Sequence, residues 1–497
     1  MSFFSTRGGS CVTASQAILY GLAQDGGLYA PAMFPAVNNA NITEMMSMTY
    51  PQRAVKILKL FLEDYSIREL EEAAEGAYGS KFDCPETAPL VRLDENTWAL
   101  ELFHGPTLAF KDMALQLLPR LMAQAAVKNR EEREICILVA TSGDTGKAAL
   151  EGFRDVPGTS CTVFYPMDGV SDIQKLQMTT TGGSNTHVIA VDGNFDDAQT
   201  GVKNLFSSES FRREAEGYGK ILSSANSINF GRLAPQIVYY FSAYADLVAS
   251  GAVGLGEPVN FCVPTGNFGN ILAGFYARNM GLPIGRLICA SNRNNVLSDF
   301  FSSGIYSTHR TFFRTISPSM DILVSSNLER LLYEAADRDG ELIKVWMNQL
   351  KECGSFSVGD QRREWIDSVF WGDCADDKDT LAEIRRRFND NGYLMDPHTA
   401  VAGHVLRQYR IKENDTTPTV IVSTASPYKF SADVLMALDG NAGGEKPDPF
   451  TASEILEKKT GVPMPPQVRG LRELPVLHRD VCGKDGMGAA VWKAFGL

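Results

Sequence analysis

The sequence lacks any apolar segment long enough to cross a membrane, and it lacks the cysteine and histidine spacings of common metal sites. No uninterrupted apolar run approaches 18 residues. The nine cysteines are scattered, no two lie closer than 20 residues, and none belongs to a CxxC pair. The six histidines form neither HExxH nor HxH. These absences predict a protein without a membrane span and without a bound metal.

Signatures of several enzyme classes are also missing. There is no GxGxxG, no GK[ST] and no GxSxG, so neither a dinucleotide, a nucleoside triphosphate nor a serine nucleophile is indicated. The net charge of -12 argues against nucleic acid as the main partner. It does not exclude a small anionic substrate, because the lysines and arginines near a binding site determine whether such a substrate binds. A start without the apolar core of a signal peptide, and dispersed cysteines, favour a cytoplasmic location.

Apolar strands and helices alternate along most of the 497 residues, a length that favours two or three lobes. The pattern predicts strands near residues 97–103, 135–140, 162–165, 188–191, 221–225, 261–264, 287–290 and 420–422. Buried strands separated by helices are typical of parallel sheets in α/β proteins, where ligands bind at the carboxyl ends of strands. Residues 369–382 and 439–449 read as exposed insertions or linkers, and the apolar residues of the tail predict that it packs on the body.

Residues 104–116, His-Gly-Pro-Thr-Leu-Ala-Phe-Lys-Asp-Met-Ala-Leu-Gln, carry the most specific chemistry. A Gly-Pro turn presents one lysine, Lys111, at the start of an apolar helix that is interrupted only at Pro119. A lysine in this position can bond covalently to a carbonyl, which is how proteins hold pyridoxal phosphate.

Two glycine-rich loops each follow a predicted strand and precede a predicted helix. In residues 141–146 the backbone N–H groups and hydroxyls can form an anion-binding nest. The alternative is a plain turn with Asp144 or Thr145 as the N-cap. In residues 264–270 two glycines allow the backbone to approach a phosphate closely. The alternative there is a tight turn with Asn270 as the cap.

Two further polar loops can contribute ligands. Residues 423–430 follow a strand, and a hydroxyl there can reach a ring nitrogen or a phosphate. Residues 224–232 place asparagines, serines and Arg232 at the start of a long helix, a combination suited to a doubly charged phosphate. The alternative for this loop is helix capping with a surface arginine.

In this order the loops closely resemble the threonine synthases, a family of fold-type-II pyridoxal phosphate enzymes. The resemblance begins at residues 5–8 and 21–29, includes the Lys111 loop, and ends at residues 423–430. It implies the tryptophan synthase β-like α/β architecture, with two parallel-sheet lobes and an N-terminal extension. The implied domains are an N-terminal one (1–100), a large cofactor-binding one (101–112 and 236–497) and a small substrate-binding one (113–235).

The resemblance also implies a role for each candidate residue. Lys111 is the covalent anchor of the cofactor, and Thr424 bonds its pyridine nitrogen. The residues expected at the cofactor phosphate are Gly266, Asn267, Phe268, Gly269 and Asn270. Those expected at the substrate carboxylate are Ser142, Gly143, Asp144 and Thr145, and those expected at the substrate phosphate are Asn226, Ser227, Asn229 and Arg232. Two positions depart from common patterns: Asp144 stands where fold-type-II enzymes usually have asparagine, and Ser426 where the family usually has histidine.

The implied reaction converts O-phospho-L-homoserine and water to L-threonine and phosphate, the last step of threonine biosynthesis, by β,γ-elimination and water addition. Lys111 must then move protons at three carbons of this small-molecule substrate. Because an ordinary lysine has a pKa of about 10.4, Lys111 must be partly desolvated to act as a base. The alternatives are a phospho-lyase that releases 2-oxobutyrate and another fold-type-II lyase or dehydratase. The sequence leaves open whether the protein is a monomer or a homodimer.

Overall fold

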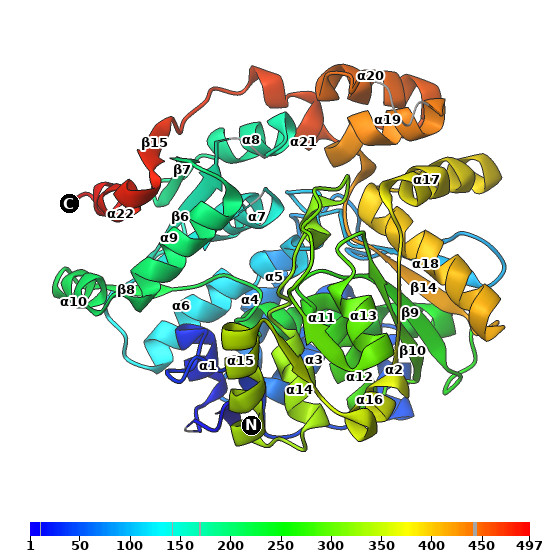
Figure 1. Cartoon of the computed structure of the whole chain (residues 1–497), viewed down its shortest axis with the longest axis horizontal. Helices are drawn as coiled ribbons and strands as arrows, with labels where there is room; N and C mark the ends of the chain where they lie inside the picture. Colours follow the sequence, from blue (N-terminus) through cyan, green and yellow to red (C-terminus); the bar gives the residue numbers. More distant parts are fainter. Residues whose placement is uncertain (10, 142, 168–169, 441–444) are drawn as a thin grey trace.

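The computed structural model describes residues 1–9, 11–141, 143–167, 170–440 and 445–497, and two lobes, each built on a parallel sheet, lie side by side in it (Figure 1). The strands expected from the sequence are present, and they fall into these two sheets. Within the described ranges, no helix has both the length and the apolar character that a bilayer crossing requires.

The larger sheet has six strands in the order β13-β10-β9-β14-β4-β3. Their bounds are β3 (Leu90–Arg92), β4 (Thr97–Glu101), β9 (Val259–Pro264), β10 (Ile284–Ser291), β13 (Phe370–Cys374) and β14 (Thr419–Ser423). All neighbours are parallel except β3 and β4. Since β3 and most of β4 precede residue 101, the large lobe begins inside the range that the sequence assigned to the N-terminal domain.

The smaller sheet has five parallel strands in the order β15-β7-β6-β5-β8. Their bounds are β5 (Glu134–Ala140), β6 (Thr159–Pro166), β7 (Thr186–Asp192), β8 (Lys220–Ser223) and β15 (Asp480–Gly483). Figure 1 shows the red C-terminal segment running from the large lobe back to this sheet. The predicted packing of the tail is confirmed, because Met487 and Val491 are buried with Leu138 and Phe164. The prediction that residues 236–497 all belong to the large lobe is wrong at its end.

The sequence predicted that residues 369–382 form an exposed insertion or linker, and this prediction is wrong. They form β13 and the start of helix α17 (Asp377–Asn391). The acidic residues that suggested a linker serve the helix start, where Asp376 Oδ1 accepts a hydrogen bond from the N–H of Asp379 at 2.8 Å. Carboxylates are favoured at a helix N-terminus because they accept its free N–H groups and complement its dipole. For the other predicted linker, 439–449, residues 441–444 lie outside the described ranges.

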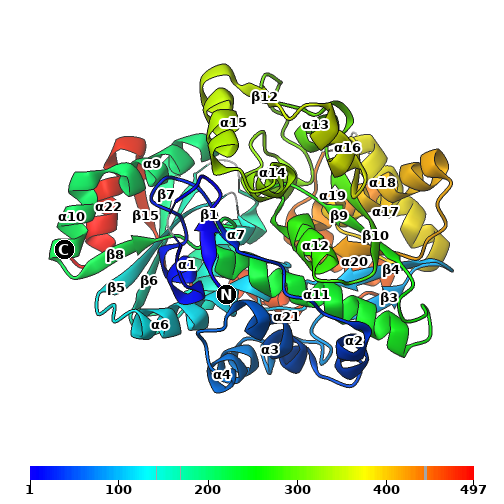
Figure 2. The ribbon, with the colours of Figure 1, turned by 90° about the horizontal axis from the view of Figure 1, so that it is seen from below.

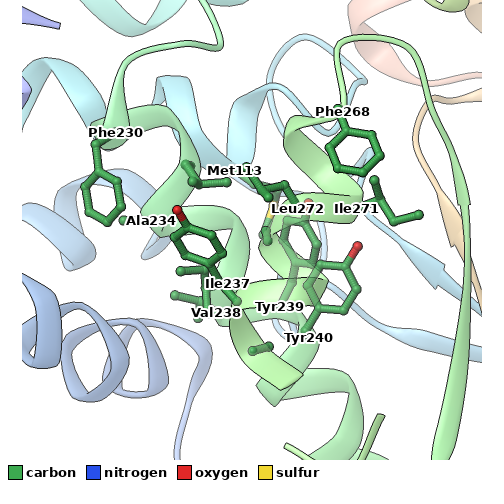
Figure 3. Packing of buried hydrophobic residues seen from close by; sticks show 14 of the residues in the cluster. Met113, Phe230, Ala234, Ile237, Val238, Tyr239, Tyr240, Phe268, Ile271 and Leu272 are labelled. Atoms are coloured by element: carbon green, nitrogen blue, oxygen red, sulfur yellow. The ribbon is translucent and has the colours of Figure 1, made fainter. Parts of the chain in front are cut away.

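The central helix α11 (Phe230–Ala249) is buried around nearly its whole circumference. Figure 2 shows the N-terminal helices α2 (Asn39–Met45), α3 (Tyr50–Phe61) and α4 (Ile67–Tyr78) on one side of it. On another side, Tyr239 and Tyr240 point toward α12 (Gly269–Asn279), as Figure 3 shows. A helix that is apolar all round needs such cover on every side. It therefore holds the N-terminal extension and the large lobe together.

The lysine loop leads into two short helices rather than one long one. These are α5 (Asp112–Leu115) and α6 (Leu118–Lys128), so the break precedes Pro119. Pro119 lies in the first turn of α6, where a missing N–H costs no helical hydrogen bond.

The other elements cover the sheets or border the site. They are β1 (Phe3–Ser5), α1 (Ala14–Tyr20), β2 (Tyr29–Pro31), α7 (Asp144–Phe153), α8 (Asp172–Thr179), α9 (Phe195–Ser207), α10 (Glu209–Gly217), α13 (Val296–Ser303), β11 (Ile305–Ser307), η1 (Pro318–Met320), α14 (Leu328–Ala335), α15 (Gly340–Cys353), β12 (Ser355–Ser357), α16 (Asp360–Asp367), α18 (Pro397–Glu413), η2 (Pro427–Phe430), α19 (Ser431–Asp439), α20 (Pro449–Thr460), α21 (Pro466–Arg469), η3 (Leu471–Glu473), η4 (Lys484–Gly486) and α22 (Met487–Ala494).

Candidate active site

Lys111 is presented by a loop that runs antiparallel to the segment leaving β14. The N–H of Phe110 donates to the carbonyl of Thr424 at 2.8 Å, and the N–H of Ser426 donates to the carbonyl of Leu108 at 3.0 Å. These backbone bonds fix the residue before Lys111 against the carboxyl end of a central strand. They also place Thr424, the residue predicted to meet the cofactor ring, beside the lysine loop.

Among the described residues, the Nζ atom of Lys111 has only weak polar contacts. It lies 3.5 Å from Asp144 Oδ2 and 3.5 Å from Ser319 Oγ, and 5.0 Å from the centre of the Phe110 ring. Burial is the main cause that lowers the pKa of Lys111; the charges of Lys429 and Arg232 act in the same direction, whereas Asp144 opposes them. The desolvation that a lysine base requires is therefore present at this position.

Asp144 is a buried carboxylate between two lysines. Its Oδ1 lies 2.9 Å from Lys429 Nζ and accepts a hydrogen bond from Gln174 Nε2 at 2.9 Å. Burial works against its ionisation, but the neighbouring charges of Lys429 and Lys111 hold the pKa of Asp144 well below its usual range. An ionised carboxylate that already pairs with Lys429 would repel the carboxylate of a substrate. Of the groups of Asp144, only the backbone N–H therefore remains a candidate donor to the substrate carboxylate.

The N-terminus of α7 has the form of an anion nest. Its N-cap is Gly143, with a φ of 140°, and not Asp144 or Thr145. Thr141 Oγ1 accepts hydrogen bonds from the N–H groups of Gly143 and Gly146, both at 3.0 Å. Within the described residues, the N–H groups of Asp144 and Thr145 remain for a ligand, since the first turn of a helix has no acceptors of its own. Ser142, predicted as a further donor, lies outside the described residues.

The loop before α12 fits a phosphate group through its backbone and one side chain. The N-cap Phe268 has a left-handed φ of 64° and buries its ring near Phe370, so only its backbone can face a ligand. Asn270 Oδ1 accepts hydrogen bonds from Tyr239 and Tyr240 at 2.6 and 2.9 Å. Its buried Nδ2 has no hydrogen-bond partner among the described residues. A buried donor of this kind at a helix N-terminus suits an anion.

Arg232 marks a second place for an anion. Its side chain is buried at the start of α11, and Nη1 donates to the carbonyl of Ala225 at 2.5 Å. No carboxylate within the described part of the chain pairs with it, and its Nε has no partner there. Burial lowers the pKa of Arg232 to about 10. A buried cation without a counter-charge is costly, and an anionic ligand would relieve that cost.

The predicted role of Asn229 as a phosphate ligand is not supported by its contacts. Its Oδ1 accepts a hydrogen bond from the N–H of Gly231 at 2.8 Å, and its Nδ2 donates to the carbonyls of Ile18 and Ser224 at 2.9 and 3.4 Å. The amide is used in capping α11 and in fixing α1, so the capping alternative describes Asn229. Asn226, Ser227 and Arg232 remain the candidates for the substrate phosphate.

Asn327, which the sequence did not single out, joins the two anion-binding loops. Its Nδ2 donates to the carbonyl of Asn267 at 3.0 Å and to Ser227 Oγ at 3.2 Å. Its Oδ1 accepts a hydrogen bond from the fully buried Arg330, which also donates to the carbonyl of Ile228 at 2.6 Å. The loop before α12 (residues 264–270) and the loop before α11 (residues 224–232) are therefore fixed side by side.

Ser319, also missed from the sequence, covers the site from the large lobe. Its N–H donates to His398 Nε2 at 3.2 Å, and His398 Nδ1 lies 2.8 Å from Asp396 Oδ1. These contacts assign the proton of His398 to Nδ1. The three residues resemble a catalytic triad only in composition, because His398 accepts from the backbone of Ser319 and not from its hydroxyl. The arrangement positions Ser319.

Replacing Gly266 by alanine is expected to weaken cofactor binding by about tenfold or more. A Cβ on Gly266 would lie 2.8 Å from the carbonyl oxygen of Ser319 and 3.2 Å from Cα of Met320, so one of the two backbone segments must move. Equilibrium titration with pyridoxal phosphate measures the effect. Gly217→Ala is the matched control, because nothing lies within 4 Å of its added Cβ. Equal affinity in both variants would contradict the proposed cup.

The site combines a lysine at a strand end, an anion cup at a helix N-terminus and a second anion site. These features fit pyridoxal phosphate. Three family models match the chain: the N terminus of threonine synthase (residues 2–78), the pyridoxal-phosphate dependent enzymes (84–353) and the C-terminal part of threonine synthase (399–475). The chain therefore belongs to the pyridoxal-phosphate dependent enzymes, in their fold-type-II architecture.

The relatives narrow this class. The chain is 41% identical over 447 residues to the threonine synthase of Pseudomonas aeruginosa, covering 89% of this chain and 91% of that one. The pyridoxal phosphate-bound threonine synthase from Brucella melitensis superimposes with a TM-score of 0.88 at 37% identity over 99% of both chains. The chain thus belongs to the threonine synthase family.

A second group of relatives is longer than this chain. The human protein named Threonine synthase-like 1 is 43% identical over 434 residues, which cover 85% of this chain but 58% of the human one. The chain therefore spans about 58% of the length of that relative.

Proposed function

We propose that this protein converts O-phospho-L-homoserine and water to L-threonine and phosphate with pyridoxal phosphate as its cofactor. The observation that carries the proposal is Arg232, which is buried and has no carboxylate partner among the described residues, because this substrate would bring a second phosphate beside that of the cofactor. Asn327, which bonds both loops, supports two anions bound close together.

Each group of residues has a separate task. Lys111 would hold the cofactor through Nζ, and the backbone of residues 266–270, with Asn270 Nδ2, would hold its phosphate. The N–H groups of Asp144 and Thr145 would orient the substrate carboxylate, and Arg232 with Asn226 and Ser227 would hold the substrate phosphate. The cofactor, when bound, withdraws electrons from the carbons that lose protons.

Lys111 is the group that moves protons in this proposal. Its burial and the cations around it favour the neutral amine, which can accept a proton from Cα of the substrate and later return one. The loop that carries Lys111 is fixed by backbone bonds to Thr424 and Ser426, so Nζ reaches neighbouring substrate atoms by side-chain rotation alone. The free cysteines fit a reducing compartment, and we retain the cytoplasm as part of the proposal.

Product analysis tests the function directly. The holoenzyme is incubated with O-phospho-L-homoserine in water enriched in ¹⁸O, and threonine, phosphate and 2-oxobutyrate are quantified. We expect equal amounts of threonine and phosphate, with ¹⁸O in the threonine hydroxyl. Formation of 2-oxobutyrate and ammonia without threonine would identify a phospho-lyase instead.

A further inference from the structure

Lys429 is a second lysine at the active site, and its contacts differ sharply from those of Lys111. It belongs to η2, its side chain is fully buried, and three acceptors surround its Nζ. They are Asp144 Oδ1 at 2.9 Å, the carbonyl of Thr107 at 2.8 Å and Gln177 Oε1 at 3.3 Å. Three acceptors match the three N–H donors of an ammonium group, so every donor of Lys429 has a partner.

The carboxylate of Asp144 is divided unequally between the two lysines. Its Oδ1 is engaged by Lys429 and Gln174 at 2.9 Å each. Within the part of the chain that the structure describes, its Oδ2 has longer contacts alone, with Lys111 Nζ at 3.5 Å and with the hydroxyl of Ser319 at 3.3 Å. Asp144 therefore forms its short, charge-assisted hydrogen bond with Lys429, whereas its contact with Lys111 is longer and weaker.

We propose that Lys429 is a positioning residue: a fixed counter-charge that engages Asp144 and so leaves Lys111 free to bind the cofactor and exchange protons. Without Lys429, Asp144 would be a buried carboxylate whose only cation is Lys111, and the two would form a tight pair. The inference rests on the proposed function only in that Lys111 carries the cofactor.

The charges around Lys111 set the direction of the expected effects. Among the described residues, the charged groups that face it are Asp144 from α7, Lys429 from η2 and Arg232 from α11. Asp112, whose carboxylate accepts two hydrogen bonds from Thr107, also feels the charge of Lys429. Removing the cation at 429 favours a proton on the Lys111 nitrogen, whereas removing the anion at 144 disfavours it.

The test is a pH titration of the visible absorbance of the holoenzyme, which reports protonation at the Lys111 nitrogen where it joins the cofactor. We expect Lys429→Met to move the midpoint upward by about one pH unit and Asp144→Asn to move it downward by a similar amount. The double variant, which replaces the ion pair by two neutral side chains, should fall between the single variants. Lys203→Met, on the surface of α9, is the matched control and should leave the midpoint unchanged.

The outcomes separate a charge role from a merely structural one. Midpoints that shift in the same direction in both single variants, or that do not shift in either, would overturn the proposal. If Lys429→Met does not fold, the comparison of Asp144→Asn with the double variant still tests the proposal. The double variant must then have a higher midpoint than Asp144→Asn. No substrate enters this titration, so its failure is distinct from a failure of the product analysis.

Discussion

Replacing Lys111 by alanine is expected to lower the turnover number by at least about 10⁴-fold, because the variant loses both the proposed covalent anchor of the cofactor and the proposed base. The visible absorbance of the holoenzyme should disappear at the same time. The fold should tolerate the change, since Asp144 keeps its short contact with Lys429. Steady-state rates, absorbance spectra and thermal unfolding measure the three effects.

The control for this experiment is a lysine outside the site. Lys203→Ala, on the exposed face of α9, should keep the absorbance, the turnover number and the melting temperature of the original protein. Addition of a small primary amine should restore part of the activity of Lys111→Ala, because the amine can occupy the space of the deleted side chain. A Lys111→Ala protein with normal turnover would contradict the role given to Lys111.

Replacing Arg232 by methionine is expected to raise KM for O-phospho-L-homoserine by about 10- to 100-fold, since a hydrogen bond to a charged group contributes about 1.5–3 kcal/mol. The free energy of unfolding of the cofactor-free protein, in contrast, should not fall in this variant. In the described structure Arg232 is buried without a carboxylate partner, so removing its charge should leave the free energy of unfolding unchanged or raise it. Steady-state kinetics and urea unfolding measure the two effects.

Inorganic phosphate provides an independent readout for Arg232. It should raise the melting temperature of the original protein more than that of Arg232→Met, because one of two anion sites is lost. Arg213→Met is the matched control, since Arg213 lies exposed on α10 and pairs with Glu209. If Arg232→Met unfolds more easily than the original protein and binds substrate normally, Arg232 is a structural cation and the second anion site is misplaced.

The sequence predicted those parts of the fold and site that depend on local patterns. The strands near residues 135–140 and 261–264 are continuous apolar runs, and the loops after them contain the glycines that a close backbone approach needs. The Lys111 loop is equally local, because a Gly-Pro turn and a helix start define it. The prediction failed for residues 369–382, where acidic residues at the start of α17 resembled a linker.

Long-range contacts could not be predicted in the same way. Lys429 is one of several polar residues in the loop 423–430, and its role depends on Asp144, which lies 285 positions earlier. Asn327 and Arg330 belong to an ordinary amphipathic pattern, yet they join loops that the chain order separates by about 40 residues. The return of the tail to the small sheet depends on β7 having a free edge, which a single sequence does not reveal.

Two lysines, Lys111 and Lys429, lie at this site, and we assign the cofactor to Lys111. Reduction of the holoenzyme with borohydride turns the lysine–cofactor bond into a stable secondary amine, and peptide mapping by mass spectrometry then locates it. We expect the modified residue to be Lys111, with Lys429 unmodified. Modification of Lys429, or of no lysine in the active site, would contradict it.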